Sequence, residues 1–372
     1  MNLKYSDLDK VEKKNRLYEV FKVFLKLGFT AFGGPGAHIG MMDEEIIEKR
    51  KWISREKFID LIGATNLIPG PNSTELAIFM GYERAGILGL LLAGVSFILP
   101  AMLIILVLAI VYVKFGTIPQ VSSILYGIKP VIMAIIIQAL YRLGKSVIKN
   151  KISIIFAIGI FGLYFLGVKE ITLLFVSAVL MLVISNFKSI KDKFYSISVI
   201  PLSLLFLIFL KIGAVLYGSG YVLLAFLEAE FIDKYGLLTM EQLLDAVAIG
   251  QFTPGPVFTT ATFIGYLLNG IPGAILATIG IFIPSFLVVW AINPLIPKLR
   301  KSKITAAMLD GVNIGSLVLM TIVSLKLGLA SLINPLTITM FIISFLILMK
   351  YKVNSAWLII AGGAIGWISS LI

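Results

Sequence analysis

The sequence predicts an all-α polytopic membrane protein whose two homologous halves form an inverted-topology repeat. The chain is 59% hydrophobic and only 14% charged, with a mean hydropathy of +1.00, whereas a soluble protein carries about a quarter charged residues. Apolar runs close to the roughly 20 residues that cross a bilayer recur along the chain. They include 86–113, 119–141, 151–168, 170–187, 271–297, 304–329, 331–349 and 354–372. A transmembrane β-barrel would instead show shorter segments of alternating polarity.

An internal repeat divides the chain into the two halves. The triplet Pro69-Gly70-Pro71 returns as Pro254-Gly255-Pro256, 185 positions later (254 minus 69). The same offset aligns further identical residues, among them Lys26 with Lys211, Glu45 with Glu230, Lys49 with Lys234, and Thr74 with Thr259. After a one-residue deletion the offset becomes 184 and aligns Gly81 with Gly265, Gly86 with Gly270, and Pro100 with Pro284. We therefore expect a first repeat at 1–190 and a second at 191–372, a duplication that is common in transporters.

Each half is expected to contain one re-entrant hairpin. A long first segment (17–41 and 195–227) is followed by a proline-broken pair of short segments (58–82 and 242–268). An arm of about 11 residues, at 1.5 Å per residue, covers roughly half of a 30 Å hydrocarbon core, so the pair fits a hairpin better than two crossings. About five transmembrane helices per half remain. Because that number is odd, the second half is expected to be inverted relative to the first.

Loop charges support this inversion, because cytoplasmic loops are enriched in Lys and Arg. In this topology the basic loops all fall on one side: 142–151, 188–193, 298–303 and 350–352. The loop before the first hairpin (42–57) is rich in Lys and Arg, whereas its counterpart (228–241) is mainly acidic. The side of the N-terminus stays open, because residues 4–16 are also basic but are interspersed with acidic residues.

Composition also limits the chemistry. The chain has no cysteine and a single histidine, His38, which excludes disulfides, thiolate metal sites and multi-histidine metal sites. We therefore expect no metal and no cofactor. The net charge of +12 is attributed to cytoplasmic loops rather than to a nucleic-acid partner. No Walker-type phosphate loop, HExxH or GxSxG motif is present, so neither ATP hydrolysis nor another enzymatic activity is expected.

The two hairpin tips are the candidate substrate site. Backbone breaks at membrane depth are tolerated where they are buried or line a wet cavity. After Pro69, Gly70 and Pro71 a new helix is expected to start near Asn72, and its free N–H groups and partial positive charge suit an anion. The predicted substrate-binding residues are Asn72, Ser73, Thr74, Thr259 and Thr260, with Pro254, Gly255 and Pro256 forming the second break. The alternative is a plain proline kink between packed helices.

Several charged residues are further candidates. Lys26 and Lys211 share one repeat position, and Lys211 follows an apolar stretch that suggests a place deep in the membrane. Ionisable groups there are functional candidates by default, although a lysine can also snorkel to the interface. Arg84 is either an anion ligand or a surface charge. Glu75 is a proton-coupling carboxylate, a helix cap or a partner for a lysine, and its counterpart, Thr260, carries no charge.

The first segment contains its own break. The stretch AFGGPGAHIG (31–40) supplies Gly33, Gly34 and Pro35, which allow a hinge or a close backbone approach. His38 lies just beyond and is either a proton carrier or a structural residue. The counterpart in the second half, LYGSGYVLL (216–224), keeps glycines but has no histidine.

Together these motifs resemble the chromate ion transporter family in its long, two-domain form. The resemblance rests on FGGPGAH (32–38), LIPGPNSTELAIFMGYERAG (67–86) and QFTPGPVFTTATFIGY (251–266), and it spans nearly the whole chain. It implies export of chromate, with sulfate as a close analogue, across a plasma membrane by halves of opposite orientation coupled to an ion gradient. The second half departs from the first, since Gly218-Ser219-Gly220 replaces Gly33-Gly34-Pro35, so an asymmetric site is expected.

The sequence thus predicts a multi-pass secondary transporter of a tetrahedral oxyanion that works by alternating access around the paired tips. Its expected partners are chromate or sulfate and the lipid bilayer, and association into a homodimer stays open. Two alternatives remain: a proton-coupled exporter of another small solute such as an organic acid, and a membrane scaffold that transports nothing.

Overall fold

The structure is a computed structural model. It describes residues 5–32, 34–66, 68–115, 119–148, 151–166, 168, 172–174, 177, 201–217, 222–293, 303–351 and 353–371. Within these ranges the chain is helical and contains no β-strand. The predicted span 170–187, the boundary between 190 and 191, and Gly33 lie wholly or mostly outside them.

The first half begins with a short 3₁₀ turn (Tyr5–Asp7), and a π-helical turn (Asp43–Lys49) follows its second helix. Its helices are α1 (Lys10–Thr30), α2 (Gly34–Met42), α3 (Arg55–Thr65), α4 (Asn72–Phe115), α5 (Pro119–Val147) and α6 (Lys151–Phe165). Asp9 caps α1 by accepting a hydrogen bond from the Glu12 N–H at 2.7 Å. The first segment is therefore broken between α1 and α2, at the glycine-rich stretch that the sequence indicated.

The second half repeats this order. Its helices are α8 (Leu202–Val215), α9 (Leu223–Leu227), α10 (Met240–Phe252), α11 (Thr260–Ile292), α13 (Lys303–Ser331), α14 (Pro335–Lys350) and α15 (Ser355–Ser369). A π-helical turn (Glu228–Lys234) follows α9, as its equivalent follows α2, and a 3₁₀ turn (Val257–Thr259) precedes α11. The duplication read from the sequence is thus present in the order of the helices.

Both α4 and α11 turn sharply at equivalent glycines. Gly86 has φ 62° and ψ −151°, and Gly270 has φ 62° and ψ −152°, a conformation that glycine adopts without the strain of a Cβ. Beyond each turn the two arms touch. A Cβ on Gly81 would lie 2.3 Å from the Gly89 oxygen, and one on Gly265 would lie 2.4 Å from the Gly273 oxygen. Each long helix is therefore a short arm that starts at the tip, followed by a long arm.

The long arm of α4 presents an apolar stripe to its surroundings. Every fourth residue is exposed from one end of the arm to the other: Ile87, Leu91, Val95, Leu99, Leu103, Val107 and Val111. The equivalent positions of α11 that begin this stripe, Ile271, Ile275 and Ile279, are exposed too. Residues four apart are neighbours on a helix surface, so these positions form a continuous apolar stripe that winds slowly around the arm and fits contact with lipid. Within the described ranges, four segments are long and apolar enough to span a membrane: Asn72–Phe115, Val121–Lys145, Val257–Ile292 and Asp310–Ser331.

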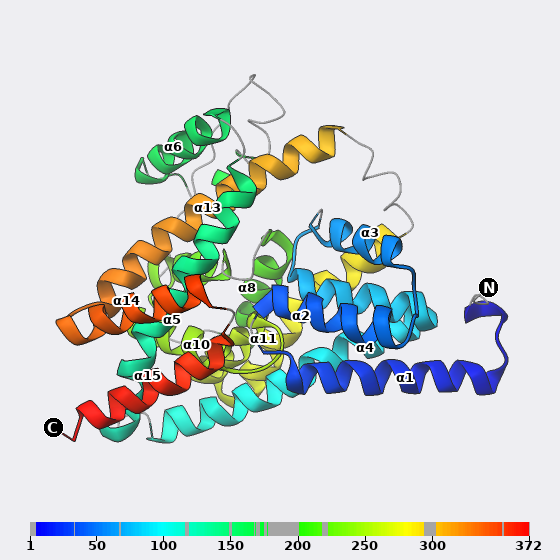
Figure 1. The fold of residues 1–372 in the computed structure, drawn as a ribbon, viewed down its shortest axis with the longest axis horizontal. Coiled ribbons are helices and arrows are strands. Elements are labelled where there is room, and N and C mark those ends of the chain that lie inside the picture. Colours follow the sequence, from blue (N-terminus) through cyan, green and yellow to red (C-terminus); the bar gives the residue numbers. More distant parts are fainter. Residues whose placement is uncertain are drawn as a thin grey trace.

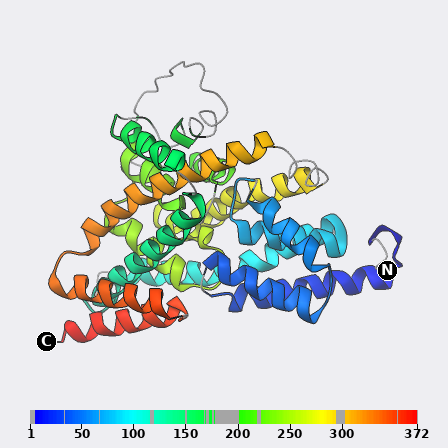
Figure 2. The same ribbon diagram turned by 45° about the horizontal axis from the view of Figure 1, so that its top comes forward.

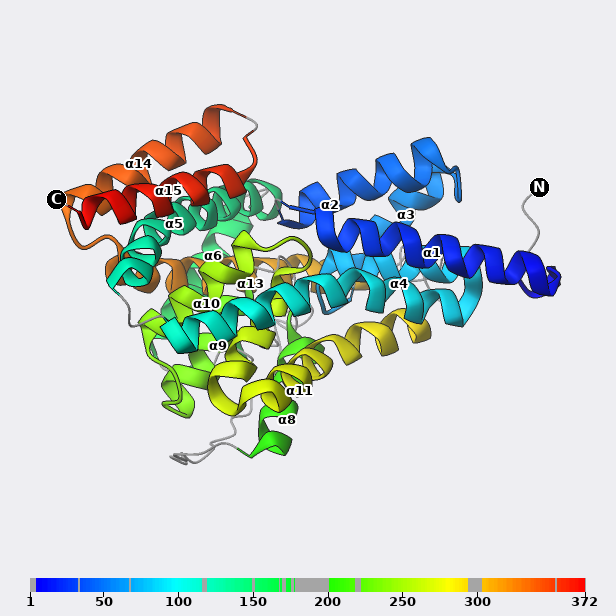
Figure 3. The same ribbon diagram turned by 90° about the horizontal axis from the view of Figure 1, so that it is seen from below.

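The halves pack around the two long helices. α1 lies along α4, α8 lies along α11, and α4 contacts α11 between them. Figure 1 shows α1 and α4 side by side toward the N-terminal end, with α13, α14 and α15 grouped around α5 at the other end. The turned views in Figures 2 and 3 keep the same grouping. The chain is therefore a duplicated all-α membrane protein, and the opposite orientation of the halves across the bilayer stays a prediction.

Candidate functional site

The first hairpin tip lies between α3 and α4. α3 ends at Thr65, the chain passes through Pro69, Gly70 and Pro71, and α4 begins at Asn72. Gly70 has φ 135°, in the region that favours glycine. A methyl group at Gly70 would lie 2.6 Å from the Ser285 hydroxyl oxygen, which belongs to α11. The tip of the first half thus rests against the long helix of the second.

The second tip is built in the same way. It joins α10 to α11 through Pro254, Gly255 and Pro256, and Gly255 has φ 89°. A methyl group at Gly255 would lie 2.8 Å from the Ala101 Cβ, on α4. Ala101 and Ser285 are equivalent positions under the offset of 184. Each tip therefore packs on the matching place in the opposite half.

Two reciprocal hydrogen bonds join the tips to the breaks in the first segments. The Gly70 N–H donates to the Leu216 carbonyl at 2.7 Å, and the Gly255 N–H donates to the Ala31 carbonyl at 2.9 Å. Leu216 follows α8 and Ala31 follows α1, and both donors and both acceptors are related by the offset of 185. Backbone N–H and carbonyl groups at four breaks, two from each half, thus pair with one another across the interface. Such pairing is needed because buried polar backbone groups are costly without a hydrogen-bond partner.

His38 ties the first tip to the first break. Its ring is buried, with Nε2 2.9 Å from the Ala31 carbonyl oxygen and Nδ1 3.1 Å from Ser73 Oγ. A carbonyl only accepts, so Nε2 carries the hydrogen, and in the neutral ring the Ser73 hydroxyl donates to Nδ1. The Ala31 carbonyl therefore accepts from both His38 and Gly255. These contacts place His38 at the meeting point of the two halves, and a role as proton carrier stays a prediction.

The predicted anion donors are buried and mostly engaged within the protein. Ser73, Thr74, Thr259 and Thr260 are each at most 1% exposed. The Thr259 hydroxyl donates to the Pro256 carbonyl at 2.6 Å, and the Thr260 hydroxyl donates to the Val257 carbonyl at 2.7 Å. The Asn72 amide donates to Asn66 Oδ1 at 2.6 Å. In this conformation the tips are closed, and an anion would have to replace these local hydrogen bonds.

The two repeat lysines lie in ion clusters rather than free at the tips. Lys26 Nζ is 2.8 Å from Glu45 Oε1, and Lys211 Nζ is 2.7 Å from Glu230 Oε1. Lys49 and Lys234 complete the clusters at 3.0 and 3.4 Å from the same glutamates. The side chains of Lys26 and Lys211 are 56% and 43% exposed. The repeat thus preserves a buried glutamate that pairs with two lysines, so both lysines are already engaged with a carboxylate.

The glutamate of the first cluster is ionised throughout the physiological range. Burial raises the pKa of Glu45, but hydrogen bonds from Lys26, Lys49 and Arg50 outweigh it and lower the value to about 2. Arg50 Nη1 lies 2.5 Å from Glu45 Oε2. The cluster therefore fastens α1 to the π-helical turn as a permanent ion pair.

Arg84 lies far from the tip. It stands 12 positions after Asn72 (84 minus 72), which corresponds to about 18 Å of helix. Its Nη2 pairs with Glu19 Oε2 at 2.6 Å, and its guanidinium carbon is 5.3 Å from the centre of the Trp52 ring. Of the two roles that the sequence left open, this placement favours a charge that fastens α4 to α1.

Glu75 does not make the capping contact that its position suggested. It is 0% exposed, and neither carboxylate oxygen has a hydrogen-bond partner among the described residues. A capping box needs the backbone N–H of the residue before the helix. That residue is Pro71, which has no N–H. The expectation of a cap is therefore wrong, and no lysine of the described chain forms an ion pair with this acid.

Sequence reasoning missed two polar networks. Asp245 Oδ2 accepts from the Tyr112 hydroxyl at 2.8 Å, and Lys129 Nζ lies 3.2 Å from Asp245 Oδ1. Lys326 Nζ lies 2.5 Å from Glu228 Oε1 and donates to the Tyr164 hydroxyl at 3.1 Å. Both lysines lie inside predicted spans, which is the signal that would have found them. The partners themselves are more than 90 positions away and were not visible in the pattern.

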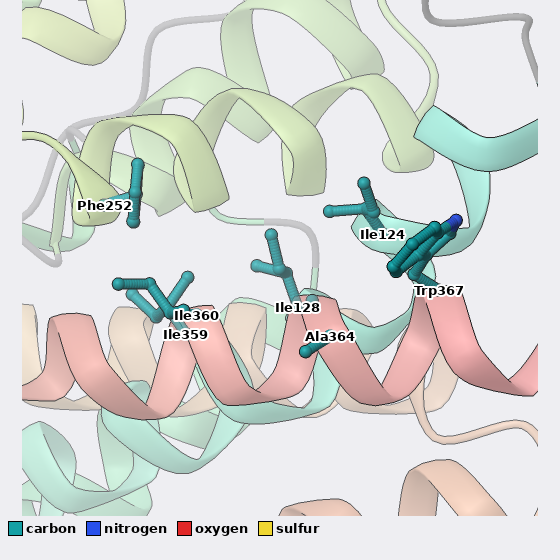
Figure 4. Close-up of a pocket in the computed structure, with 8 residues that line it drawn as sticks. Ile124, Ile128, Phe252, Ile359, Ile360, Ala364 and Trp367 are labelled. Atoms are coloured by element: carbon teal, nitrogen blue, oxygen red, sulfur yellow. The ribbon is translucent and has the colours of Figure 1, made fainter.

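A second hollow among the described residues is less suited to an anion. A cavity of about 330 Å³ lies between α5, α15 and the end of α10 (Figure 4). Its lining is apolar and includes Ile128, Phe252, Ile359 and Trp367. The described residues contain no group of three or more histidine, aspartate or glutamate side chains placed to hold a metal ion. Unlike this cavity, the tips combine a helix terminus with hydroxyl groups.

The comparisons with known proteins agree on one family. The sequence profile of the chromate transporter family matches residues 18–182 and, a second time, residues 203–367. A chromate transport protein of Cupriavidus metallidurans is 30% identical over 368 residues, covering 94% of this chain and 92% of the relative. A probable chromate transport protein of Synechococcus elongatus is 30% identical over 81% of each chain. An uncharacterized transporter of Methanocaldococcus jannaschii is 28% identical over 97% of this chain and 96% of its own. No solved structure matches the chain.

Proposed function

This chain belongs to the chromate transporter family, and from that premise we propose that it is a secondary transporter that exports chromate across the plasma membrane, with sulfate as an analogue. The family and the apolar helices make it a multi-pass membrane protein of an ion-transporter family. The proposal adds the substrate, the place where the anion binds and the way in which the halves move.

One observation is the main support for the proposed mechanism. The reciprocal pair of hydrogen bonds, Gly70 to Leu216 and Gly255 to Ala31, joins the halves at four backbone breaks related by the repeat. Transporters of duplicated architecture place their substrate between repeats, at the ends of broken helices. In the proposed cycle the halves rock around this contact, so that access to the tips alternates between the two sides of the membrane.

The anion binds at the start of α4 in this proposal. The first N–H groups of a helix have no partner within it and carry a partial positive charge, which suits a tetrahedral dianion. Ser73 and Thr74 stand in the first turn, and the Thr74 hydroxyl has no hydrogen-bond partner among the described residues. Thr259 and Thr260 would turn from their own carbonyls to the anion when the tips open. The lysines stay paired with their glutamates and add positive electrostatic potential at the tips from a distance.

The test is transport by the purified protein in lipid vesicles. Uptake of labelled chromate and of labelled sulfate is measured, with protein-free vesicles as the blank and an organic acid as the competing substrate. We expect both oxyanions to move and each to inhibit uptake of the other. Movement of the organic acid alone would assign a different substrate to the same fold. Movement of none of the three under any gradient would refute the proposal of oxyanion transport.

A further inference from the structure

One of the two tips holds a buried acid that has no partner in the described part of the chain. Glu75 stands in the first turns of α4, is 0% exposed, and both of its carboxylate oxygens lack a hydrogen-bond partner among the described residues. The Ser285 hydroxyl, which comes from α11 in the other half, is also 0% exposed and also lacks one there. A methyl group on Gly70 would lie 2.2 Å from Glu75 Oε1 and 2.6 Å from Ser285 Oγ. The two side chains therefore face the same point at the tip.

The second tip shows that this pair is not a general feature of the fold. Thr260 stands where the first tip has Glu75, and Ala101 stands where the second half has Ser285. The Thr260 hydroxyl donates to the Val257 carbonyl at 2.7 Å, and Ala101 offers only a methyl group. Backbone geometry is shared between the tips, whereas the carboxyl and the unpartnered hydroxyl belong to one of them. A structural requirement of the hairpin would have applied to both.

From this arrangement we infer that Glu75 and Ser285 form a proton-binding site, which takes up one proton when the oxyanion binds and carries it in the same direction. The inference rests on the proposed function. A buried carboxylate without a counter-charge is costly, whereas the protonated acid is neutral, and a rotation of its side chain would let it donate its O–H to the facing hydroxyl. The proton comes from water on one side, binds a carboxylate oxygen of Glu75 and returns to water on the other side.

Charge links this proton to the anion. Glu75 stands three residues after Asn72, about 4.5 Å along the helix axis. An ionised Glu75 and a dianion at the start of α4 would repel each other at this separation, so neutralising the acid favours the anion. Two ligands that favour the same state of a protein raise each other's affinity by the same factor. This reciprocity predicts co-transport rather than exchange of the proton for the anion.

Among the residues that the structure describes, no cation pairs with Glu75. Tyr217, which follows α8, lies near Glu75, and its neutral phenol supplies no positive charge. His38 on α2 bonds Ser73, two positions before Glu75, and both of its ring nitrogens are already used. Ser285 is the group that faces Glu75 from α11. A metal cation of the calcium type takes six or more oxygen ligands, and these side chains supply far fewer, so a proton fits the site better.

Sulfate uptake into vesicles tests the inference, because sulfate stays a dianion over the neutral range whereas chromate itself takes up a proton there. Each cycle with one proton and one sulfate moves one negative charge, so with the membrane potential held at zero an outside-acid gradient of one pH unit supports up to about tenfold accumulation. We expect Glu75→Gln to abolish this accumulation and to retain exchange of sulfate for sulfate. Glu83→Gln is the matched control, since Glu83 lies on the same arm but pairs with Lys57, and it should keep the gradient effect.

Three results would overturn the inference. The first is accumulation by Glu75→Gln equal to that of the wild type. The second is accumulation driven by a sodium gradient and lost in Glu75→Gln, which would make the site a cation site. The third is a result from infrared spectra of the purified protein, a measurement that does not depend on transport activity. A protonated carboxyl band should be present in the wild type and absent from Glu75→Gln, and its absence from the wild type would refute protonation.

The infrared arm also separates this inference from the proposed function. A wild-type protein that moves neither oxyanion but shows the carboxyl band would refute oxyanion transport and leave the proton site standing. If Glu75→Gln does not fold, the double variant E75T/S285A takes its place, because it copies the chemistry of the second tip. The double variant should likewise lose the gradient effect and the band.

Discussion

Replacing Gly255 by alanine should destabilise the contact between the two halves. Gly255 has φ 89°, and its N–H donates to the Ala31 carbonyl at 2.9 Å. Alanine keeps this donor, so the substitution tests the backbone conformation and the packing rather than the hydrogen bond itself. The new methyl group would lie 2.8 Å from the Ala101 Cβ, which is closer than two carbon atoms can approach without a shift.

The magnitude follows from two contributions. A residue other than glycine in a sparsely populated backbone region costs about 1–3 kcal/mol. Overpacking a filled interface costs about 1–3 kcal/mol more. Their sum, at least about 2 kcal/mol, should lower the midpoint of thermal unfolding of a chain of 372 residues by about 3 °C or more. Adding Ala101→Gly to the Gly255→Ala chain should recover the stability lost through overpacking, because it removes the methyl group that the new one contacts. The cost of the backbone conformation should remain.

Thermal unfolding in detergent, followed by tryptophan fluorescence, measures the effect. Gly63→Ala is the matched control, because Gly63 lies inside α3 beside the other tip and a Cβ there would meet no atom within 4 Å. Alanine is the better helix former, so this control should be as stable as the wild type or more stable by up to about 1 kcal/mol. A Gly255→Ala protein as stable as the control would refute the described conformation of the second tip.

Two further predictions concern the ion clusters. Lys211→Met should reduce transport, because the buried Glu230 then loses its nearer partner at 2.7 Å and keeps only Lys234 at 3.4 Å. Adding Glu230→Gln should restore transport if Lys211 acts only as a partner of that glutamate. A double variant as inactive as the single one in the vesicle assay would assign Lys211 to the anion instead. Glu45 has a pKa of about 2 in the folded protein, below the ordinary 4.5, so its ionisation stabilises the fold above that ordinary value. This stabilisation should be lost as the pH falls toward 2. Glu45→Gln should therefore flatten the dependence of the unfolding midpoint on pH between 4.5 and about 2. An unchanged pH profile in this variant would contradict the described cluster.

Much of the fold was predictable because apolar length and repetition are local signals. The helix break at Pro69-Gly70-Pro71 and its twin at Pro254 appear where the sequence placed them, and the long arm of α4 coincides with the predicted span 86–113. Proline removes a donor and glycine permits unusual dihedrals wherever they occur, so such breaks can be read without knowing the tertiary contacts.

The candidate site was less predictable, because side-chain partners depend on distant parts of the chain. The sequence near Lys26 did not indicate that Glu45 would pair with it, although both recur 185 positions later as Lys211 and Glu230. The repetition of both residues was visible in the sequence, but the ion pair between them was not. The capping expectation for Glu75 failed for a local reason that was available from the start, since the preceding Pro71 has no N–H to offer.

The sequence by itself determined that the chain is a duplicated helical membrane protein with a broken hairpin in each half, because hydropathy, proline and glycine act within a few residues of where they stand. Only the tertiary structure decided what the breaks face. It set each tip against the first-segment break of the opposite half, through Gly70 to Leu216 and Gly255 to Ala31, and it closed Glu75 and Ser285 together at one tip. These contacts join residues more than 140 positions apart, and their geometry follows from how two similar halves pack, which no local pattern encodes.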